Sequence, residues 1–268
     1  MAEAGPTSGL MAGKRALILG VANDHSIAWG IAKVLHAAGA ELAFTYQGEG
    51  FGRRVEPLAR SLGAEIVLPA DVQDPASLDA LFAEVGRVWG GLDVLVHAIA
   101  YSDKAELDGR FLDTSRENFL RSLDISCYSL VDLTRRAAPL MTGGGSIITL
   151  TYIGAQRVTP NYNVMGVAKA ALESAVRYLA SDLGPQGIRV NAISPGPMRT
   201  LAGAAIAGAR KVYRATEMNA PLRANASLEA VGGAALYLAS DLSVSTTGEI
   251  IFVDGGYHVT GMAQPENL

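Results

Sequence analysis

Tyr162 and Lys169 are the first pair of side chains whose types and spacing could do chemistry, near the start of a predicted long helix. Seven residues at about 100° each make roughly 700°, close to two full turns, so both side chains should leave on one face. An ammonium near a phenol favours its anionic or strongly hydrogen-bonding form. Such a pair can polarise a carbonyl and stabilise an enolate, while the lysine holds a ribose hydroxyl. The same spacing is also common on a solvated helix face, so both interpretations stay open.

Two further positions bear on that chemistry. Tyr152 follows a predicted strand, at the edge where parallel sheets bind ligands. The position four before Lys169 is Met165, so the Tyr-x-x-x-Lys arrangement of ordinary alcohol dehydrogenases and ketoreductases is absent. We therefore expect the proton-handling phenol one turn further away.

The loop Gly20–Gly30 joins the first predicted strand to the first helix. A dinucleotide site needs a tight turn here and free N–H groups at a helix N-terminus. We expect Gly20 to supply the turn, Ser26 to cap the helix and offer a hydroxyl to phosphate, and Gly30 to allow close helix–strand packing. The loop is not G-x-G-x-x-G, so an ordinary turn with a serine cap is the alternative.

The ends of the next two strands indicate which dinucleotide would bind. Gln47 stands where an acidic residue usually holds the adenosine ribose. It can hydrogen-bond a hydroxyl but cannot neutralise a 2′-phosphate, which favours NADH over NADPH, although Arg53 and Arg54 follow closely. Asp71 and Val72 can receive the adenine, and Asp71 can equally well begin a turn.

Alternating strands and helices position these residues. The periodicity of apolar residues and the glycines that end each run predict seven strands, with enough chain between them for crossover connections. This indicates one domain over residues 1–268. The fold class is α/β, a Rossmann-like doubly wound parallel sheet with helices on both faces. The predicted strands are 15–19, 41–45, 65–68, 92–99, 146–151, 189–193 and 250–253, and the predicted helices are 27–38, 53–62, 75–89, 118–141, 163–183 and 228–240.

Residues 198–220 form a long connection for a domain of this kind, in which about 4–6 residues is usual. A small surface helix pair is one interpretation. A mobile lid over a site at the carboxyl ends of the strands is the other.

Composition excludes several classes of protein. The net charge of −4 and the pI of about 5.6 argue against a nucleic-acid or anionic membrane surface. One cysteine and four scattered histidines give no disulfide framework and no metal site. No apolar stretch is long enough for a membrane helix and no leader is evident, so we expect a cytoplasmic protein. Charged residues are only 18%, which suggests a surface covered by another subunit.

Taken together, these blocks resemble the bacterial enoyl-acyl-carrier-protein reductases, a divergent branch of the short-chain dehydrogenase/reductase superfamily. The resemblance covers essentially residues 12–260. It rests on Gly20 with Ser26–Ala28, Thr45–Gln47, Tyr152, Pro160–Gly166 with Lys169, Arg189–Ser194, Gly196-Pro197, Arg199–Ala202 and Val253–Tyr257.

The resemblance implies NADH-dependent reduction of a trans-2-enoyl thioester on acyl carrier protein, the last step of each fatty-acid elongation cycle. Tyr162 would bind the thioester carbonyl, Tyr152 would be the second tyrosine, Lys169 would hold the nicotinamide ribose, and Ser102 would lie near the substrate. The family is typically homotetrameric, and its lid orders over cofactor and acyl chain. The residues expected at the cofactor are Gly20, Ser26, Ile27, Gln47, Asp71, Val72, Ile99, Lys169, Met198, Arg199, Thr200, Leu201 and Ala202.

One departure from the family pattern affects the predicted nicotinamide pocket. Ala100-Tyr101 stand where relatives often have Gly-Phe, which narrows the pocket and adds a hydroxyl. Two other functions stay open: a ketoreductase of the same superfamily, against which Met165 argues, and a catalytically silent nicotinamide-binding sensor, which would not need both phenols.

Overall fold

A seven-stranded, all-parallel sheet forms the centre of the molecule, with the strand order β3-β2-β1-β4-β5-β6-β7. The structure is a computed structural model that describes residues 7, 9–204 and 206–268. The predicted doubly wound sheet is confirmed. The strands are β1 (Arg15–Leu19), β2 (Glu41–Tyr46), β3 (Ile66–Pro69), β4 (Val94–His97), β5 (Gly145–Leu150), β6 (Ile188–Pro195) and β7 (Ile250–Val253).

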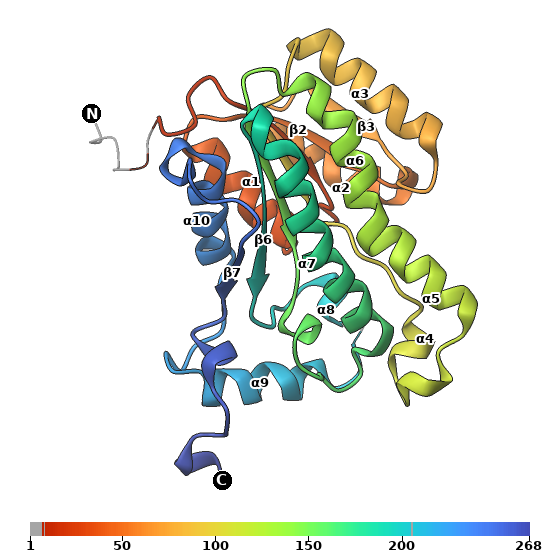
Figure 1. Cartoon of the computed structure of the whole chain (residues 1–268), viewed down its shortest axis with the longest axis vertical. Helices are drawn as coiled ribbons and strands as arrows, with labels where there is room; N and C mark the ends of the chain where they lie inside the picture. The colour runs from red at the N-terminus through yellow and green to blue at the C-terminus, as the bar shows by residue number, and fades with distance from the viewer. Residues whose placement is uncertain (1–6, 8, 205) are drawn as a thin grey trace.

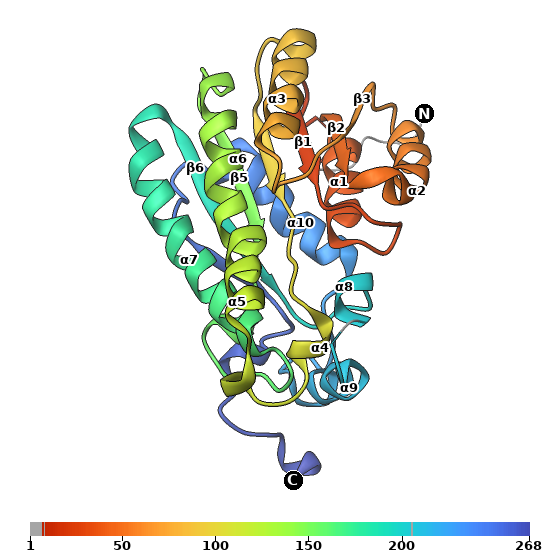
Figure 2. The same cartoon turned by 90° about the vertical axis from the view of Figure 1, so that its right-hand side faces the viewer.

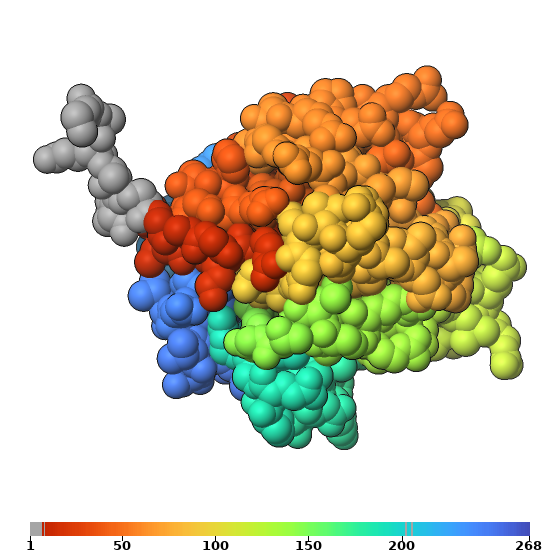
Figure 3. All heavy atoms as spheres, turned by 90° about the horizontal axis from the view of Figure 1, so that it is seen from above, coloured from red at the N-terminus to blue at the C-terminus, as the bar shows by residue number. Residues whose placement is uncertain are grey.

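Helices cover both faces of this sheet (Figure 1). One face carries α1 (Ile27–Ala37), α2 (Gly48–Ser61) and α10 (Leu228–Ala239), and the other carries α3 (Pro75–Trp89), α5 (Arg116–Leu123), α6 (Ser129–Ala137) and α7 (Asn163–Leu183). Seen from the amino ends of the strands, the colours pass from orange through yellow and green to turquoise across the second face (Figure 3). Three short helices lie beyond the carboxyl ends of the strands: α4 (Lys104–Leu107), α8 (Leu201–Ala204) and α9 (Ala209–Asn219) (Figure 2).

Strand β1 shows why the sheet is buried on both sides. Ala16 and Ile18 pack into the core on the α1 and α10 face, whereas Leu17 and Leu19 pack into the core on the α3, α6 and α7 face. Successive side chains of a strand point to opposite faces, so a continuous apolar run fits a strand covered on both sides. Each buried leucine contributes about 1.5–3 kcal/mol relative to an exposed one.

The strand order reverses beside β1, and this positions the site. β1 pairs with β2 on one side and with β4 on the other, with Leu19 opposite His97 at its carboxyl end. The crossovers from β1 and β4 leave toward different faces, and in doubly wound sheets the ligand crevice lies outside the carboxyl ends of the strands at such a point. The carboxyl ends of β1 and β4 are therefore the expected crevice, and the candidate site lies there.

Some element boundaries differ from the sequence prediction. Helix α2 begins at Gly48, whereas the sequence predicted a start at Arg53. The first turn was missed because its glycines have low helix propensity. Gly52 is required there, since a Cβ would lie 2.8 Å from the Tyr46 ring. β4 is shorter than predicted. The predicted helix 118–141 is broken by a π-helical segment, Asp124–Tyr128, and ends in a 3-10 turn at Ala138–Leu140.

Gly30 has a different partner from the one predicted. A Cβ on Gly30 would lie 2.8 Å from Cβ of Leu228, the first residue of α10. The same crossing brings Gly232 against Val34, where a Cβ would meet Cγ2 at 2.5 Å. Gly30 therefore allows close packing of α1 on α10, and the predicted helix–strand contact is wrong.

Candidate active site

Gly20 forms the turn after β1 and lies directly against the end of β4. Its φ is +96°, and a Cβ built on it would stand 2.0 Å from the Ala98 carbonyl oxygen. Only glycine fits this conformation and this contact. Gly20 places no side chain between the two strand ends. A dinucleotide that crosses this point needs backbone alone there.

Ser26 organises the loop in a different way from the one predicted. It is the N-cap residue of α1, but its side chain makes no capping bond to the helix. Its hydroxyl oxygen instead accepts hydrogen bonds from the N–H groups of Ala22, at 3.0 Å, and Asn23, at 3.1 Å. The prediction that the Ser26 side chain caps the helix is therefore wrong. Ser26 instead shapes the turn that leads to Ile27, the first residue of the helix.

Gln47 and Asp71 meet at the ends of β2 and β3. Gln47 Nε2 donates to Asp71 Oδ2 at 3.0 Å, and Asp71 Oδ1 accepts from the Gln73 N–H at 2.9 Å. Asp71 thus begins a turn and still presents a carboxylate beside Gln47. Val72 packs partly buried against the core, whereas Arg53 and Arg54 are exposed on α2.

Tyr152 and Tyr162 pack against one another. Their ring centroids are 5.0 Å apart with an interplanar angle of 65°, an edge-to-face pair. Gly154 makes room for both rings, because a Cβ there would lie 2.4 Å from Tyr162 Cδ1 and 3.3 Å from Tyr152 Cδ1. Gly166 in α7 lets the helix approach this turn, since its Cβ would stand 2.8 Å from the Gly154 carbonyl oxygen. The two phenols are therefore fixed by close packing.

Tyr162 lies just outside α7, as its N-cap residue. Its neighbours Asn161 and Asn163 both have positive φ, +58° and +37°. Asparagine tolerates this conformation better than most residues. Asn161 Nδ2 donates to the Ala207 carbonyl at 2.9 Å, and Asn163 Nδ2 donates to the Leu107 carbonyl at 3.1 Å. Tyr162 is thus held by its packing and by two anchored neighbours, and not by helical geometry.

Burial keeps both phenols protonated. It raises the pKa of Tyr152 to about 12, and it raises the pKa of Tyr162 well above its usual value, helped by the nearby Tyr152 and Glu173. Of the two forms expected for Tyr162, anionic or strongly hydrogen-bonding, the raised pKa favours the hydrogen-bonding one. A protonated phenol donates a hydrogen bond, which suits it to bind a carbonyl oxygen.

Lys169 is buried in α7 and faces the end of β5. Its Nζ donates to the Leu150 carbonyl at 2.8 Å, two residues before Tyr152. Burial lowers the pKa of Lys169 to about 8, and the nearby acidic groups Cys127 and Glu173 oppose part of this shift. The ammonium form predominates at neutral pH and has donors left for a ligand.

Serine hydroxyls of α5 and the π-helical segment hold the chain that leaves β4. Ser126 Oγ accepts from the Tyr101 N–H at 2.9 Å and donates to the Tyr101 carbonyl at 3.0 Å. Ser122 Oγ donates to Ser102 Oγ at 3.0 Å. Ser102 thus lies in a polar cluster, and Ile99 packs partly buried against the core. The Tyr101 side chain is 43% exposed.

Within residues 198–204 and 206–220 the structure has two helices, α8 and α9, at the carboxyl ends of the strands (Figure 2). Met198 packs against the core, and Thr200 Oγ1 accepts from the Gly203 N–H at 3.0 Å. The Arg199 guanidinium lies 4.7 Å from the centroid of the Tyr213 ring in α9. Leu201 is exposed at the start of α8, and the side chain of Ala202 lies outside the described part of the chain.

Comparison with known proteins decides the family. The profile of the family described as Enoyl-(Acyl carrier protein) reductase matches residues 20–258. The chain belongs to this family. It is 59% identical over 261 residues to enoyl-[acyl-carrier-protein] reductase [NADH] 2 of Rhizobium meliloti, covering 97% of each protein.

Solved structures of reductases of this family are closely similar. The enzyme of Anaplasma phagocytophilum in complex with NAD has a TM-score of 0.93 at 57% identity, with 96% of this chain and 98% of that chain covered. The Bacillus cereus enzyme with NADP⁺ and indole naphthyridinone has a TM-score of 0.93 at 49% identity, with 94% and 99% covered. The resemblance drawn from the sequence is thereby confirmed at the level of the family.

The structure adds residues around the candidate site that the sequence did not single out. Gly154, Gly166 and Asn161 shape the surroundings of the two phenols, and Glu173 binds the turn that carries Tyr152. The signal available in the sequence was the pair of glycines flanking Tyr162. It could not be interpreted without knowing what each missing Cβ would touch.

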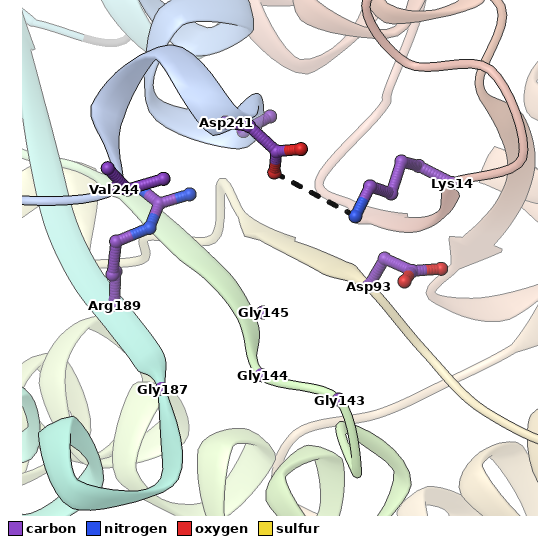
Figure 4. Close-up of a pocket in the computed structure, with 10 residues that line it drawn as sticks. Lys14, Asp93, Gly143, Gly144, Gly145, Gly187, Arg189, Asp241 and Val244 are labelled. Carbon is purple, nitrogen blue, oxygen red and sulfur yellow. Dashed lines mark ion pairs between the residues drawn. The ribbon is translucent and has the colours of Figure 1, made fainter.

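A cavity of about 200 Å³ lies at the opposite, amino edge of the sheet (Figure 4). Lys14, Arg189, Asp93 and Asp241 line it with the glycine run 143–145. Lys14 pairs with Asp241 at 3.9 Å, Arg189 donates to the Leu238 carbonyl and to Ser243 Oγ, and Asp93 pairs with Arg15. This cavity is separate from the crevice beside Gly20.

Within the described ranges no group of three or more histidines, cysteines and acids is arranged to hold a metal ion. A search of the same residues for a helix long and apolar enough to cross a membrane finds none.

Proposed function

We propose that this protein reduces the trans-2 double bond of enoyl thioesters carried by acyl carrier protein, with NADH as reductant. The observation that carries the proposal is the edge-to-face pair of protonated phenols, the half-buried Tyr152 and the buried Tyr162, next to the strand end where Lys169 is anchored. Family membership supports the substrate class, and the relatives named above as NADH-dependent support the reductant.

The residues at the crevice fit a dinucleotide. The positive φ of Gly20 lets the turn after β1 pass directly against the Ala98 carbonyl, where any Cβ would clash, and Gln47 and Asp71 present hydrogen-bonding groups at the next two strand ends. In this proposal Gly20, Ser26 and Ile27 border the pyrophosphate, Gln47 holds the adenosine ribose, and Asp71 with Val72 receives the adenine. Lys169 holds the nicotinamide ribose beside Ile99. When bound, NADH supplies the hydride.

Tyr162 binds the carbonyl oxygen of the thioester. As hydride is added at C3, negative charge moves to this oxygen, and a hydrogen bond from the protonated phenol stabilises the enolate. A proton taken up from solvent then adds at C2 to give the saturated thioester. Tyr152 supports the ring of Tyr162, and both rings exclude water from the reacting atoms.

Segment 198–220 acts as the lid in this proposal. Met198, Arg199, Thr200, Leu201 and Ala202 lie on the cofactor side, and Ser102 lies near the acyl chain on the other. The hydrogen bond from Asn161 to Ala207 supports the assignment, because it joins the segment to the residue next to Tyr162.

A homotetramer is the expected assembly, and a cytoplasmic location stays a prediction. Exposed apolar residues on α5, the π-helical segment and α7 support a covered face: Leu120, Tyr128, Val167 and Tyr178. Analytical ultracentrifugation of the purified protein tests this assembly, and a monomer at all concentrations contradicts it.

Purified protein, NADH and crotonyl thioester test the function. We expect the absorbance of reduced nicotinamide to fall in proportion to thioester. No loss under saturating substrate contradicts the proposal, and NADH binding without turnover favours a silent sensor. Turnover of a 3-ketoacyl thioester instead favours a ketoreductase, although Met165 occupies that family's tyrosine position and is buried beside Tyr162.

A further inference from the structure

Glu173 is a buried acidic side chain that the proposed reaction does not use. It lies in α7 one turn after Lys169 and is only 5% exposed. Removing an ionised carboxylate from water costs several kcal/mol unless hydrogen bonds satisfy its oxygens. A carboxylate in this place therefore needs partners on both oxygens.

One short segment after β5 supplies the hydrogen-bond donors for both oxygens. Thr151 Oγ1 donates to Glu173 Oε1 at 2.8 Å, and Gln156 Nε2 donates to Oε2 at 3.1 Å. Thr151 and Gln156 are the two ends of the segment that follows β5, and Tyr152 and Gly154 lie between them. Glu173 therefore clamps this segment, residues 151–156, against α7.

Lys169 binds Leu150, the residue just before the segment. Its Nζ donates to the Leu150 carbonyl at 2.8 Å. Residues four apart on a helix lie on the same face. Lys169 and Glu173 thus hold consecutive residues, Leu150 and Thr151, from one face of α7, and Tyr152 comes next.

The clamped segment also seats the second phenol. A Cβ on Gly154 would stand 2.4 Å from Tyr162 Cδ1, so the ring rests directly on the backbone of the segment. A shift of this backbone would move both Tyr152 and Tyr162.

The charge of Glu173 matters as well as its hydrogen bonds. Three titratable groups act on Lys169 from the elements around it: His97 of β4, Cys127 of the π-helical segment and Glu173. Burial lowers the pKa of His97 to about 3 and raises the pKa of Cys127, so both are uncharged near neutral pH. Both oxygens of Glu173 accept hydrogen bonds, as those of a carboxylate do, so Glu173 is the one of the three that brings negative charge to Lys169.

We propose that Glu173 is a positioning residue of the reductase site, which fixes the segment carrying Tyr152 and seating Tyr162 and provides the negative charge facing Lys169. The proposal rests on the roles proposed above for these three residues. Glu173 acts through them and touches no reacting atom.

Glu173→Gln tests both parts. The variant keeps the size of the side chain and an acceptor for Thr151, but it removes the charge. We expect kcat/KM for crotonyl thioester to fall about 10- to 100-fold, because small misplacements of catalytic groups have effects of this size. In the parent, NADH affinity should fall as pH rises through the pKa of Lys169, and we call this fall the alkaline limb of the pH profile. In Glu173→Gln the alkaline limb should move to lower pH, because the charge that opposes the effect of burial on the Lys169 pKa is lost.

Thr151→Val separates positioning from charge. It removes the donor to Oε1 and keeps the carboxylate, so kcat should fall while the alkaline limb does not move to lower pH. Asp132→Asn is the matched control: Asp132 is a buried carboxylate of α6 paired with Arg135 and Arg136. Its loss should lower the melting temperature and leave both readouts unchanged.

The proposal is overturned if Glu173→Gln keeps kcat/KM within about twofold of the parent and its NADH affinity falls over the same pH range as that of the parent. A lower melting temperature as the only change, as expected for Asp132→Asn, overturns it too. If Glu173→Gln does not fold, an unchanged kcat of Thr151→Val overturns the proposal. If the parent protein does not oxidise NADH, the proposed function fails, whereas the pH dependence of NADH affinity still tests Glu173.

Discussion

The two sides of the crevice are built differently. On the β1–β3 side, the groups proposed to bind the cofactor are a glycine turn and the hydrogen-bonded pair of the exposed Gln47 and the half-buried Asp71. On the β4–β6 side, Tyr162 and Lys169 are buried and Tyr152 is half-buried, and burial shifts the pKa values of all three. The first side can bind through backbone shape, and the second presents groups whose chemistry depends on their surroundings.

This difference implies that substitutions on the two sides have different consequences. Changes among the buried phenols should reduce turnover, because the transition state needs a donor in one place. Changes on the β1–β3 side should act on NADH affinity or on stability.

The largest effect is expected for Tyr162→Phe. The ring keeps its packing on Gly154 and Tyr152, but the donor to the carbonyl oxygen is lost. We expect kcat to fall about 10²- to 10³-fold, with NADH affinity within about twofold, measured by steady-state kinetics and by NADH fluorescence titration. Lys169→Ala should show the opposite pattern, with cofactor binding damaged most. A reversal of the two patterns means that the roles are exchanged.

Gly20→Ala should destabilise the protein by about 2–3 kcal/mol and weaken NADH binding, because the Cβ meets the Ala98 carbonyl and φ is positive. Urea denaturation gives the free energy of unfolding. Gly50→Ala is the control: it lies in α2 with nothing within 4 Å of the added Cβ. This control should be neutral or stabilising by about 0.5–1 kcal/mol. Equal effects at both positions contradict a special role for Gly20.

Asn161→Asp should raise the KM for the thioester about 5- to 10-fold. Aspartate tolerates positive φ but cannot donate to the Ala207 carbonyl, so the link between the lid and the Tyr162 loop is lost. Asn225→Asp is matched to it, because Asn225 Nδ2 donates to the Tyr213 carbonyl of α9 at 2.9 Å, with no link to the Tyr162 loop. If both variants raise KM equally, the bond from Asn161 has no particular function.

The smallest effect is expected for Gln47→Ala, a loss of NADH affinity of about two- to fivefold, because an exposed hydrogen bond contributes about 1 kcal/mol or less. Competition binding measures it. The parent protein should also use NADPH much less efficiently than NADH. Equal efficiency means that Arg53 or Arg54 reaches the 2′-phosphate.

Local patterns predicted much of the fold. Helix α7 and strand β7 have the predicted bounds, Asn163–Leu183 and Ile250–Val253. Apolar periodicity and glycine stops are local, so they can be detected in the chain itself. The start of α2 was missed because its glycines look like a loop.

The parts of the site that depend on distant contacts could not be predicted. Gly30 packs on Leu228, almost two hundred residues later in the chain, so its partner is set by the crossing of α1 and α10. The direction of the Tyr162 pKa shift depends on how deeply the ring is buried, and the seven-residue spacing to Lys169 says nothing about that. The residue types of the site were available from the sequence, but their environments were not.

The most direct test of the central claim is a single turnover with crotonyl thioester and NADH that carries deuterium at the transferred position. Mass spectrometry of the product should show one deuterium at C3 of a saturated thioester for each NADH consumed. Unchanged thioester, or deuterium transfer only to a 3-ketoacyl thioester, would contradict the account.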